Sequence, residues 1–177
     1  MLIYILLGLA VLLAVFVIVV ARMPSNFGVE RSAKMNAPAA AIFEHVNDFH
    51  RWEAWSPWAK MDPTAKNSFE GPASGTGAAF AWEGNSQVGQ GRMTILESRK
   101  PDFIRIRLDF LKPFPSVALV DFTFKPSGNQ TMVTWRMTGE RVFMCKMVSV
   151  FMNMDKMIGG QYEKGLAAIQ GIVEKSC

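Results

Sequence analysis

The chain has 177 residues, 50% of them hydrophobic, and its 19 basic and 15 acidic side chains give a formal net charge of +4 at pH 7. The two cysteines, Cys145 and Cys177, are too few for a disulfide framework and lack metal-ligand spacing. Two free thiols fit a cytoplasmic location, although one bridge between them in an oxidising compartment stays open. The basic residues are scattered, which favours an ordinary mildly basic surface over nucleic-acid binding or a lipid-headgroup patch.

The first residues form an uncharged apolar run from Leu2 to Ala21, closed by Arg22 and Pro24. A helix of this length spans about 30 Å of hydrocarbon. A cleaved signal peptide is the main alternative, but the run lacks a basic leader and a small-residue cleavage site. We therefore expect a retained transmembrane anchor over residues 1–22 and a short linker over 23–26.

The side of the membrane follows from the charges that flank the run. Arg22, Arg31 and Lys34 come after it, whereas only the terminal amine precedes it. Positive flanks favour the cytoplasmic side. We expect one ordinary-sized domain, residues 27–177, on that side.

The domain begins with a predicted strand over residues 27–35 and a short helix over 38–46, for which Pro38 suits the first turn. A tryptophan-rich segment, residues 49–63, comes next. Its indoles either rim a cavity or touch the membrane interface, or they pack against the first helix at the open end of the sheet. We favour packing.

A series of alternating segments then predicts an antiparallel meander. Ile104, Ile106, Leu108 and Phe110 share one face of the clearest strand, and charged residues occupy the other face. The predicted strands cover residues 78–83, 87–98, 103–110 and 116–125, followed by a strand that carries Val133, Trp135 and Met137. Leu119 shares the parity of Asp121, so the sequence leaves open which face of the strand over residues 116–125 points inward.

From about Arg141 the apolar period becomes helical and continues to Val173 without a proline. This spacing of three and four residues predicts one long amphipathic helix. Its apolar side needs a surface of matching size, and the concave face of the sheet provides one.

Several local sequences resemble the membrane-anchored bacterial branch, often labelled polyketide cyclase or dehydrase, of the START-like (SRPBCC) superfamily. They are Asn36-Ala37-Pro38, Val46-Asn47-Asp48-Phe49, Trp52, Trp55-Ser56-Pro57-Trp58, Asp62-Pro63, Gly71-Pro72, Gly75-Thr76-Gly77, Trp82-Glu83-Gly84-Asn85, Val88-Gly89-Gln90-Gly91, Thr134-Trp135 and Gly160 to Leu166. The resemblance covers nearly all of residues 27–174. It implies an α+β helix-grip fold, in which a curved antiparallel sheet wraps around a long C-terminal helix, and a bacterial inner-membrane location.

The same resemblance implies an elongated apolar cavity between the sheet and the long helix. Strand parity and helical phase direct a set of large side chains toward it, and a Met-rich helix gives such a wall adaptable packing. The expected ligand-binding residues are Trp55, Trp82, Ile95, Ile106, Phe122, Trp135, Met147, Phe151, Met154, Ile158 and Tyr162. Each of them is also an ordinary core residue by its spacing alone.

No motif specifies a reaction, a metal or a cofactor. His45 and His50 have no carboxylate or cysteine partner at catalytic or metal-ligand spacing, and the Gly-x-Gly pairs open no helix that could cradle a phosphate. An acid or base inside the cavity would have to come from Glu83, Arg92, Asp121, Arg136 or Tyr162, and parity places most of these outside.

We therefore expect a membrane-anchored domain that binds a small hydrophobic molecule such as a lipid, an isoprenoid or a polyketide-like compound. Two alternatives remain from the sequence. One is a cyclase or dehydratase acting on a polyketide-like substrate. The other is a protein-interaction module whose interior is filled by its own side chains, with an exposed apolar patch near Trp55 to Trp58.

Overall fold

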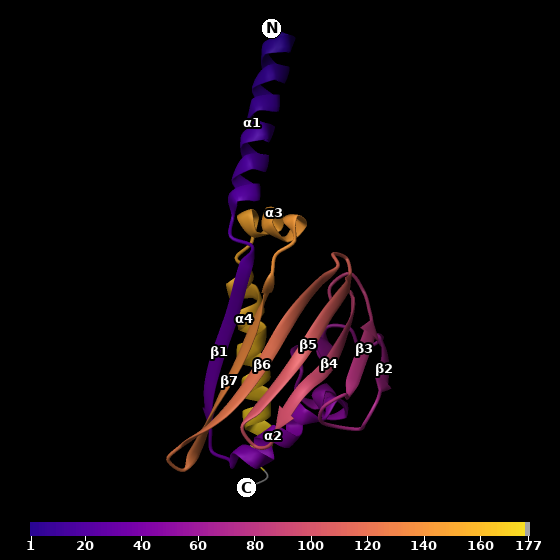
Figure 1. Ribbon diagram of the computed structural model, residues 1–177, viewed down its shortest axis with the longest axis vertical. Helices are drawn as coiled ribbons and strands as arrows, with labels where there is room; N and C mark the ends of the chain where they lie inside the picture. The colour runs from indigo at the N-terminus through magenta and orange to yellow at the C-terminus, as the bar shows by residue number, and fades with distance from the viewer. Residues whose placement is uncertain (176–177) are drawn as a thin grey trace.

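The computed structural model describes residues 1–175 of the chain, without the side chain of Phe151. A long helix, α1 (Leu2–Arg22), stands clear of a domain in which a curved sheet wraps around a second long helix, α4 (Met154–Val173) (Figure 1). Almost every side chain of α1 is exposed. By length and composition α1 is able to cross a membrane, and a signal sequence would pass the same test.

Within the described residues, seven strands form one antiparallel sheet in the order β1-β7-β6-β5-β4-β3-β2. The strands are β1 (Asn26–Met35), β2 (Lys66–Glu70), β3 (Ala79–Glu83), β4 (Gln90–Arg99), β5 (Phe103–Lys112), β6 (Ser116–Ser127) and β7 (Gln130–Glu140). The meander and the helix-grip fold are confirmed. Strand β2 was not predicted, because all five of its residues are exposed and carry no alternation.

The alternation of apolar residues divides the sheet into an outer face and an inner face, the latter turned toward α4. Val120, Phe122 and Phe124 of β6 are buried on the inner face, whereas Leu119 is 37% exposed. The facing of β6, which the sequence left open, is therefore settled with Leu119 outside.

Helix α2 (Ala39–Asn47) and two short 3₁₀ helices, η1 (Phe49–Ala54) and η2 (Pro57–Lys60), lie between β1 and β2 in the chain. Figure 1 shows α2 at the end of the domain opposite α1. Ile42, Phe43 and Val46 form the buried side of α2, as their helical spacing predicts.

The prediction of one continuous helix from about Arg141 to Val173 is wrong. Strand β7 extends to Glu140, and two helices follow, α3 (Phe143–Phe151) and α4, separated at Met152 and Asn153. The Asn153 side chain accepts a hydrogen bond from the Lys156 amide at 2.9 Å, which is the N-cap arrangement that begins a new helix. The apolar spacing continues through this break, so periodicity alone hid it.

Arg31 of β1 fixes α4 to the edge of the sheet. Its guanidinium reaches Asp155 at 3.0 Å and Glu163 at 2.7 Å, so it bridges two turns of α4. Gly159 lies between these acids and makes room, since a Cβ there would be 2.1 Å from Arg31 Nη2. Hydrogen bonds from Arg31 are the main reason that the pKa of Asp155 is lowered.

We expect Arg31→Gln to lower the thermal midpoint of the full chain and to change its pH dependence. Because the pKa of Asp155 is lowered in the folded protein, its contribution is present above the unfolded pKa and is lost as the pH falls through the lower folded value. The difference in midpoint between wild type and variant should therefore shrink on acidification from neutral pH to below the ordinary pKa of an aspartate. Differential scanning fluorimetry at several pH values measures this.

The matched control is Arg136→Gln on the outer face. Arg136 Nε lies 3.8 Å from the Glu30 carboxylate, with both side chains more than half exposed, so this variant should change the midpoint little at any pH. A pH-independent difference for Arg31→Gln would show that the ion pairs with α4 do not stabilise the fold.

Candidate ligand-binding site

The inner face of the sheet is fully buried at the α2 end but only half-buried on strands β3 to β5 toward the α1 end. At the α2 end, Met35, Ile104 and Phe124 are at most 1% exposed. We call the half-buried inner-face side chains Phe80, Trp82, Met93 and Phe110 the apolar mouth. Register places them together, because Phe80 pairs with Met93, and Gly91 pairs with both Trp82 and Phe110.

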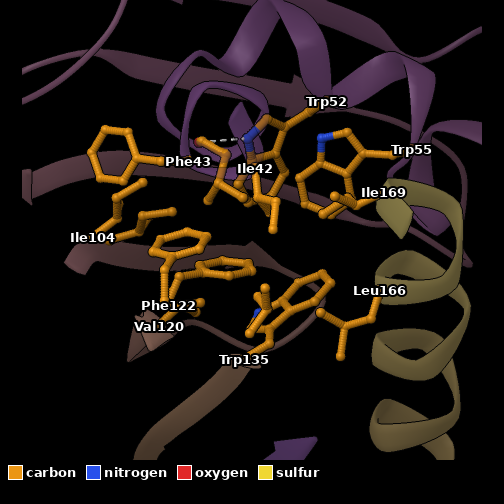
Figure 2. Close-up of a cluster of buried hydrophobic side chains, with 14 of the residues drawn as sticks. Ile42, Phe43, Trp52, Trp55, Ile104, Val120, Phe122, Trp135, Leu166 and Ile169 are labelled. Carbon is orange, nitrogen blue, oxygen red and sulfur yellow. Dashed lines mark hydrogen bonds between the residues drawn. The ribbon is translucent and has the colours of Figure 1, made fainter. Parts of the chain in front are cut away.

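A cluster of aromatic rings fills the interior next to α4 (Figure 2). Trp135 of β7 stacks on Tyr162 of α4 with ring centroids 3.9 Å apart, and it contacts Phe122 at 4.8 Å and Trp55 at 5.5 Å. Gly165 permits this contact, since a Cβ there would lie 2.8 Å from the Trp135 ring. This part of the interior is occupied by the protein's own side chains.

The tryptophan segment packs against α2, as we favoured. Trp52 and Trp55 are 6% and 1% exposed. Trp52 Nε1 donates to the Val46 carbonyl at 2.9 Å, and Trp55 Nε1 donates to the His45 carbonyl at 3.0 Å. The two indoles thus satisfy carbonyl groups that the last turn of a helix leaves without partners. An exposed patch at Trp55 to Trp58 is not found, because Trp55 is buried and Trp58 is half-buried.

Two polar groups lie inside the aromatic cluster. The indole N–H of Trp135 is buried and forms no hydrogen bond of ordinary geometry within the described residues; the Tyr162 hydroxyl is the polar group beside it. Tyr162 is 2% exposed, and burial raises the pKa of its hydroxyl, which therefore stays protonated at neutral pH. The interior therefore holds one N–H donor without an ordinary hydrogen bond and one neutral hydroxyl.

The other predicted site residues fall into three groups. Ile95, Ile106, Phe122 and Ile158 lie on or against the core, and Trp82 belongs to the apolar mouth. Met147 is on α3 and Met154 begins α4; both are half-buried and lie outside this core cluster. The Phe151 side chain lies outside the described part of the structure.

Polar side chains proposed as possible acids or bases lie mostly outside. Arg92 pairs with Glu70, Asp121 pairs with Arg105, and Glu83 and Arg136 are exposed. Tyr162 is the buried member of that set. His45 is half-buried, its Nδ1 has no partner in the described structure, and burial lowers its pKa. It is therefore neutral at neutral pH.

Two surface hollows lie away from the aromatic cluster. A groove of about 850 Å³ runs over the ends of β1, β7 and β6 and is lined by Val117, Leu119, Thr138 and Val142 among others. A smaller hollow of about 260 Å³ lies beside Phe49, Phe69 and the loop at Gly71. Neither contains a predicted site residue.

The predicted site omitted Phe80 of the mouth, although Phe80 shares the strand parity of the predicted Trp82. It also omitted Met93 and Phe110. Both share the parity of buried neighbours on their strands, Ile95 and Leu108 respectively. Strand parity would therefore have found them, but it does not distinguish a half-buried position from a buried one.

An antiparallel sheet curved around a C-terminal helix defines the helix-grip class of proteins. The match to a known family follows the same boundaries. Residues 26–174 match the family described as polyketide cyclase / dehydrase and lipid transport, and the chain belongs to this family. No curated protein matches the chain.

Solved structures share the fold at low sequence identity. Protein CV1439 from Chromobacterium violaceum is 13% identical with a TM-score of 0.59, covering 86% of this chain and 99% of its own. The Aha1 dimer from Colwellia psychrerythraea has 12% identity and a TM-score of 0.59, covering 84% and 96%. The di-domain ARO/CYC StfQ of the steffimycin biosynthetic pathway has 11% identity and a TM-score of 0.62. It covers 86% of this chain, which spans about half of StfQ (52%).

We expect Trp135→Phe to cost less stability than Trp52→Phe, although both remove the same part of a buried indole. Trp52→Phe also loses a hydrogen bond and leaves the Val46 carbonyl unpaired. Trp135→Phe instead removes a buried donor that has no acceptor. From typical values for such groups, the difference should be about 2 kcal/mol in unfolding free energy, measured by urea denaturation of the full chain in detergent. Equal losses would mean that the Trp135 N–H has a partner in solution.

Proposed function

We propose that this chain is a membrane-anchored domain that binds a small hydrophobic molecule between the inner face of its sheet and α4. The apolar mouth is the observation that carries the proposal. Phe80, Trp82, Met93 and Phe110 present a half-buried apolar surface that packs directly against the buried core. An apolar ligand on this surface would gain roughly 25 cal/mol for each Å² removed from water.

The interior also provides the few polar groups that such a ligand needs for orientation. The Trp135 N–H is a buried donor that its neighbour, the Tyr162 hydroxyl, does not give a hydrogen bond of ordinary geometry, which is unfavourable unless another group accepts from it. The Tyr162 hydroxyl lies on the ring stacked against it. A ligand that reaches the aromatic cluster with a carbonyl or hydroxyl group would satisfy both. The family description, which includes lipid transport, supports this class of ligand.

By strand register, Phe110 and its partner Gly91 lie near the end of the sheet where β7 leads into α3, and α3 contacts the end of α1. We propose that residues 1–22 anchor the chain in the bacterial inner membrane, that 23–26 form a linker, and that 27–177 form the binding domain on the cytoplasmic side. Under this arrangement an apolar molecule passes between bilayer and mouth without crossing bulk water.

Catalysis of ring closure or dehydration is a second candidate, favoured by one observation. Tyr162 is a buried, neutral hydroxyl on the inner side of α4, where it could donate a proton to a substrate oxygen. The family description includes cyclases and dehydrases.

Filling the mouth should abolish ligand binding. We expect full-length protein, expressed in bacteria and released from detergent in native mass spectrometry, to carry a stoichiometric small-molecule adduct that Met93→Trp loses. The larger ring on β4 would cover the inner face between the neighbouring mouth residues of β3 and β5, where the ligand is proposed to bind. Leu96→Trp is the matched control, since Leu96 is 46% exposed on the same strand.

Lipids that surround α1 should be equal in all three proteins, so the comparison isolates the inner face. An adduct kept by Leu96→Trp and lost by Met93→Trp supports the proposal. Identical adducts in wild type and both variants would contradict it and favour a protein-interaction module with a filled interior.

Tyr162→Phe separates binding from catalysis. If the domain only binds, the copurified molecule should have the same mass in wild type and variant, because the phenyl ring keeps the stacking on Trp135. If the domain is a dehydratase, the variant should hold the substrate, heavier than the wild-type product by one water. Mass spectrometry of the extracted ligand distinguishes the two results.

A further inference from the structure

Helix α3 lies between the membrane-spanning candidate α1 and the rest of the domain. In Figure 1 it runs across the lower end of α1 and does not continue its direction. Lys146 Nζ of α3 donates to the carbonyl of Met23, the residue that ends α1, at 2.9 Å. The position of α3 relative to α1 is therefore fixed by a direct contact.

Helix α3 exposes apolar side chains and buries its charged one, which is the opposite of a helix on a water-exposed surface. Over residues 142–152 the single charged side chain is Lys146, and it is 8% exposed. The other hydrogen-bonding side chain in this stretch, Ser149, donates to the Lys146 carbonyl at 2.7 Å. The exposed residues are apolar: Val142, Phe143, Met144, Val150 and Met152 are 37–47% exposed.

The exposed apolar residues of the helix share one side. Phe143, Met144 and Val150 fall within one sector at the helical angle of about 100° per residue, and half-buried Met147 lies between them. Lysine is almost never buried unless it has a partner, and a contiguous apolar helix side is rarely left to water. Here the ammonium group has its partner in α1, and the apolar side points away from the domain.

We propose that α3 is an interfacial helix that lies in the plane of the membrane at the point where α1 leaves it. This proposal rests on the anchoring role given to α1 above. If α1 crosses the bilayer, a helix that runs across its end lies along the membrane surface, and its apolar side extends the lipid-contacting surface of α1. The apolar side of α3 would contact lipid at the boundary between the headgroups and the acyl chains.

The contact with α1 also explains why the one charge of α3 points inward. The carbonyl groups at the C-terminal end of α1 lack intrahelical partners and carry the negative end of the helix dipole. An ammonium group placed there satisfies one of them and is itself compensated. The helix then presents to the bilayer a side without charge.

Spin labels on the full chain in vesicles of phosphatidylcholine and phosphatidylglycerol test the proposal. In a Cys145→Ser, Cys177→Ser background, Met144→Cys reports on α3, Val11→Cys on α1 and Leu96→Cys on the outer face of the sheet. Accessibility to oxygen, which concentrates in lipid, is compared with accessibility to a water-soluble nickel chelate. Val150→Cys is a second reporter on the same side of α3, should Met144→Cys disturb packing.

We expect oxygen accessibility to exceed nickel accessibility at Val11 and at Met144 or Val150, and the reverse at Leu96. A lipid-exposed Val11 with a nickel-accessible α3 would overturn the proposal while leaving the anchor in place. Nickel access at both would overturn the anchor as well. Labels on α3 shielded from both reagents and broadened by spin coupling would show that a second copy of the chain covers α3 instead. None of these results depends on whether Met93→Trp loses a ligand.

Discussion

The width of the inner face of the sheet is the constraint on which the rest of the structure depends. Seven strands about 4.8 Å apart span roughly 30 Å, whereas one helix is about 10 Å across. Helix α4 is tied to the β1 edge by Arg31 and reaches as far as Trp135. The sheet beyond it needs other cover. The rings of η1 and η2 supply that cover near α2, and strands β3 to β5 remain half-covered toward α1. The apolar mouth is the part of the face that these helices leave half-buried, and η1 contacts it at Phe80 through Phe49.

The large indoles allow a short segment to cover this area. Trp52 and Trp55 each bury a large apolar ring. Each indole also donates a hydrogen bond to a carbonyl group in the last turn of α2. Trp135 has the same burial without an acceptor. An unpaired buried donor costs stability, and local rules of this kind are broken most often at functional sites. The three tryptophans therefore differ: two of them pair with the backbone of the fold, and the third is the one that the proposed ligand would use.

Alternation along the strands carried most of the fold information in the sequence. It assigned Ile106 and Phe122 to the inner face, and it failed for β2, which has no buried residue. Helical spacing was less informative, because the apolar period continues across Asn153 even though its side chain begins a new helix. The helical spacing therefore predicted that Met147 faces the cavity. In the structure Met147 lies on α3, before the break between the two helices. The degree of burial along the inner face depends on which helices lie opposite, and no local pattern encodes that.

The connection between α1 and the sheet limits the distance between the domain and α1. Three residues separate Arg22 from Asn26, a span of about 10 Å even when extended. Two of them are tied down, since Ser25 accepts a hydrogen bond from the Arg141 amide at 2.7 Å and Met23 accepts one from Lys146. With α1 in a bilayer, the connecting residues are too short and too firmly held for the domain to move away from the membrane. The domain would then stay at the membrane surface. A molecule that delivers or receives its ligand would have to come within about 10 Å of the end of α1.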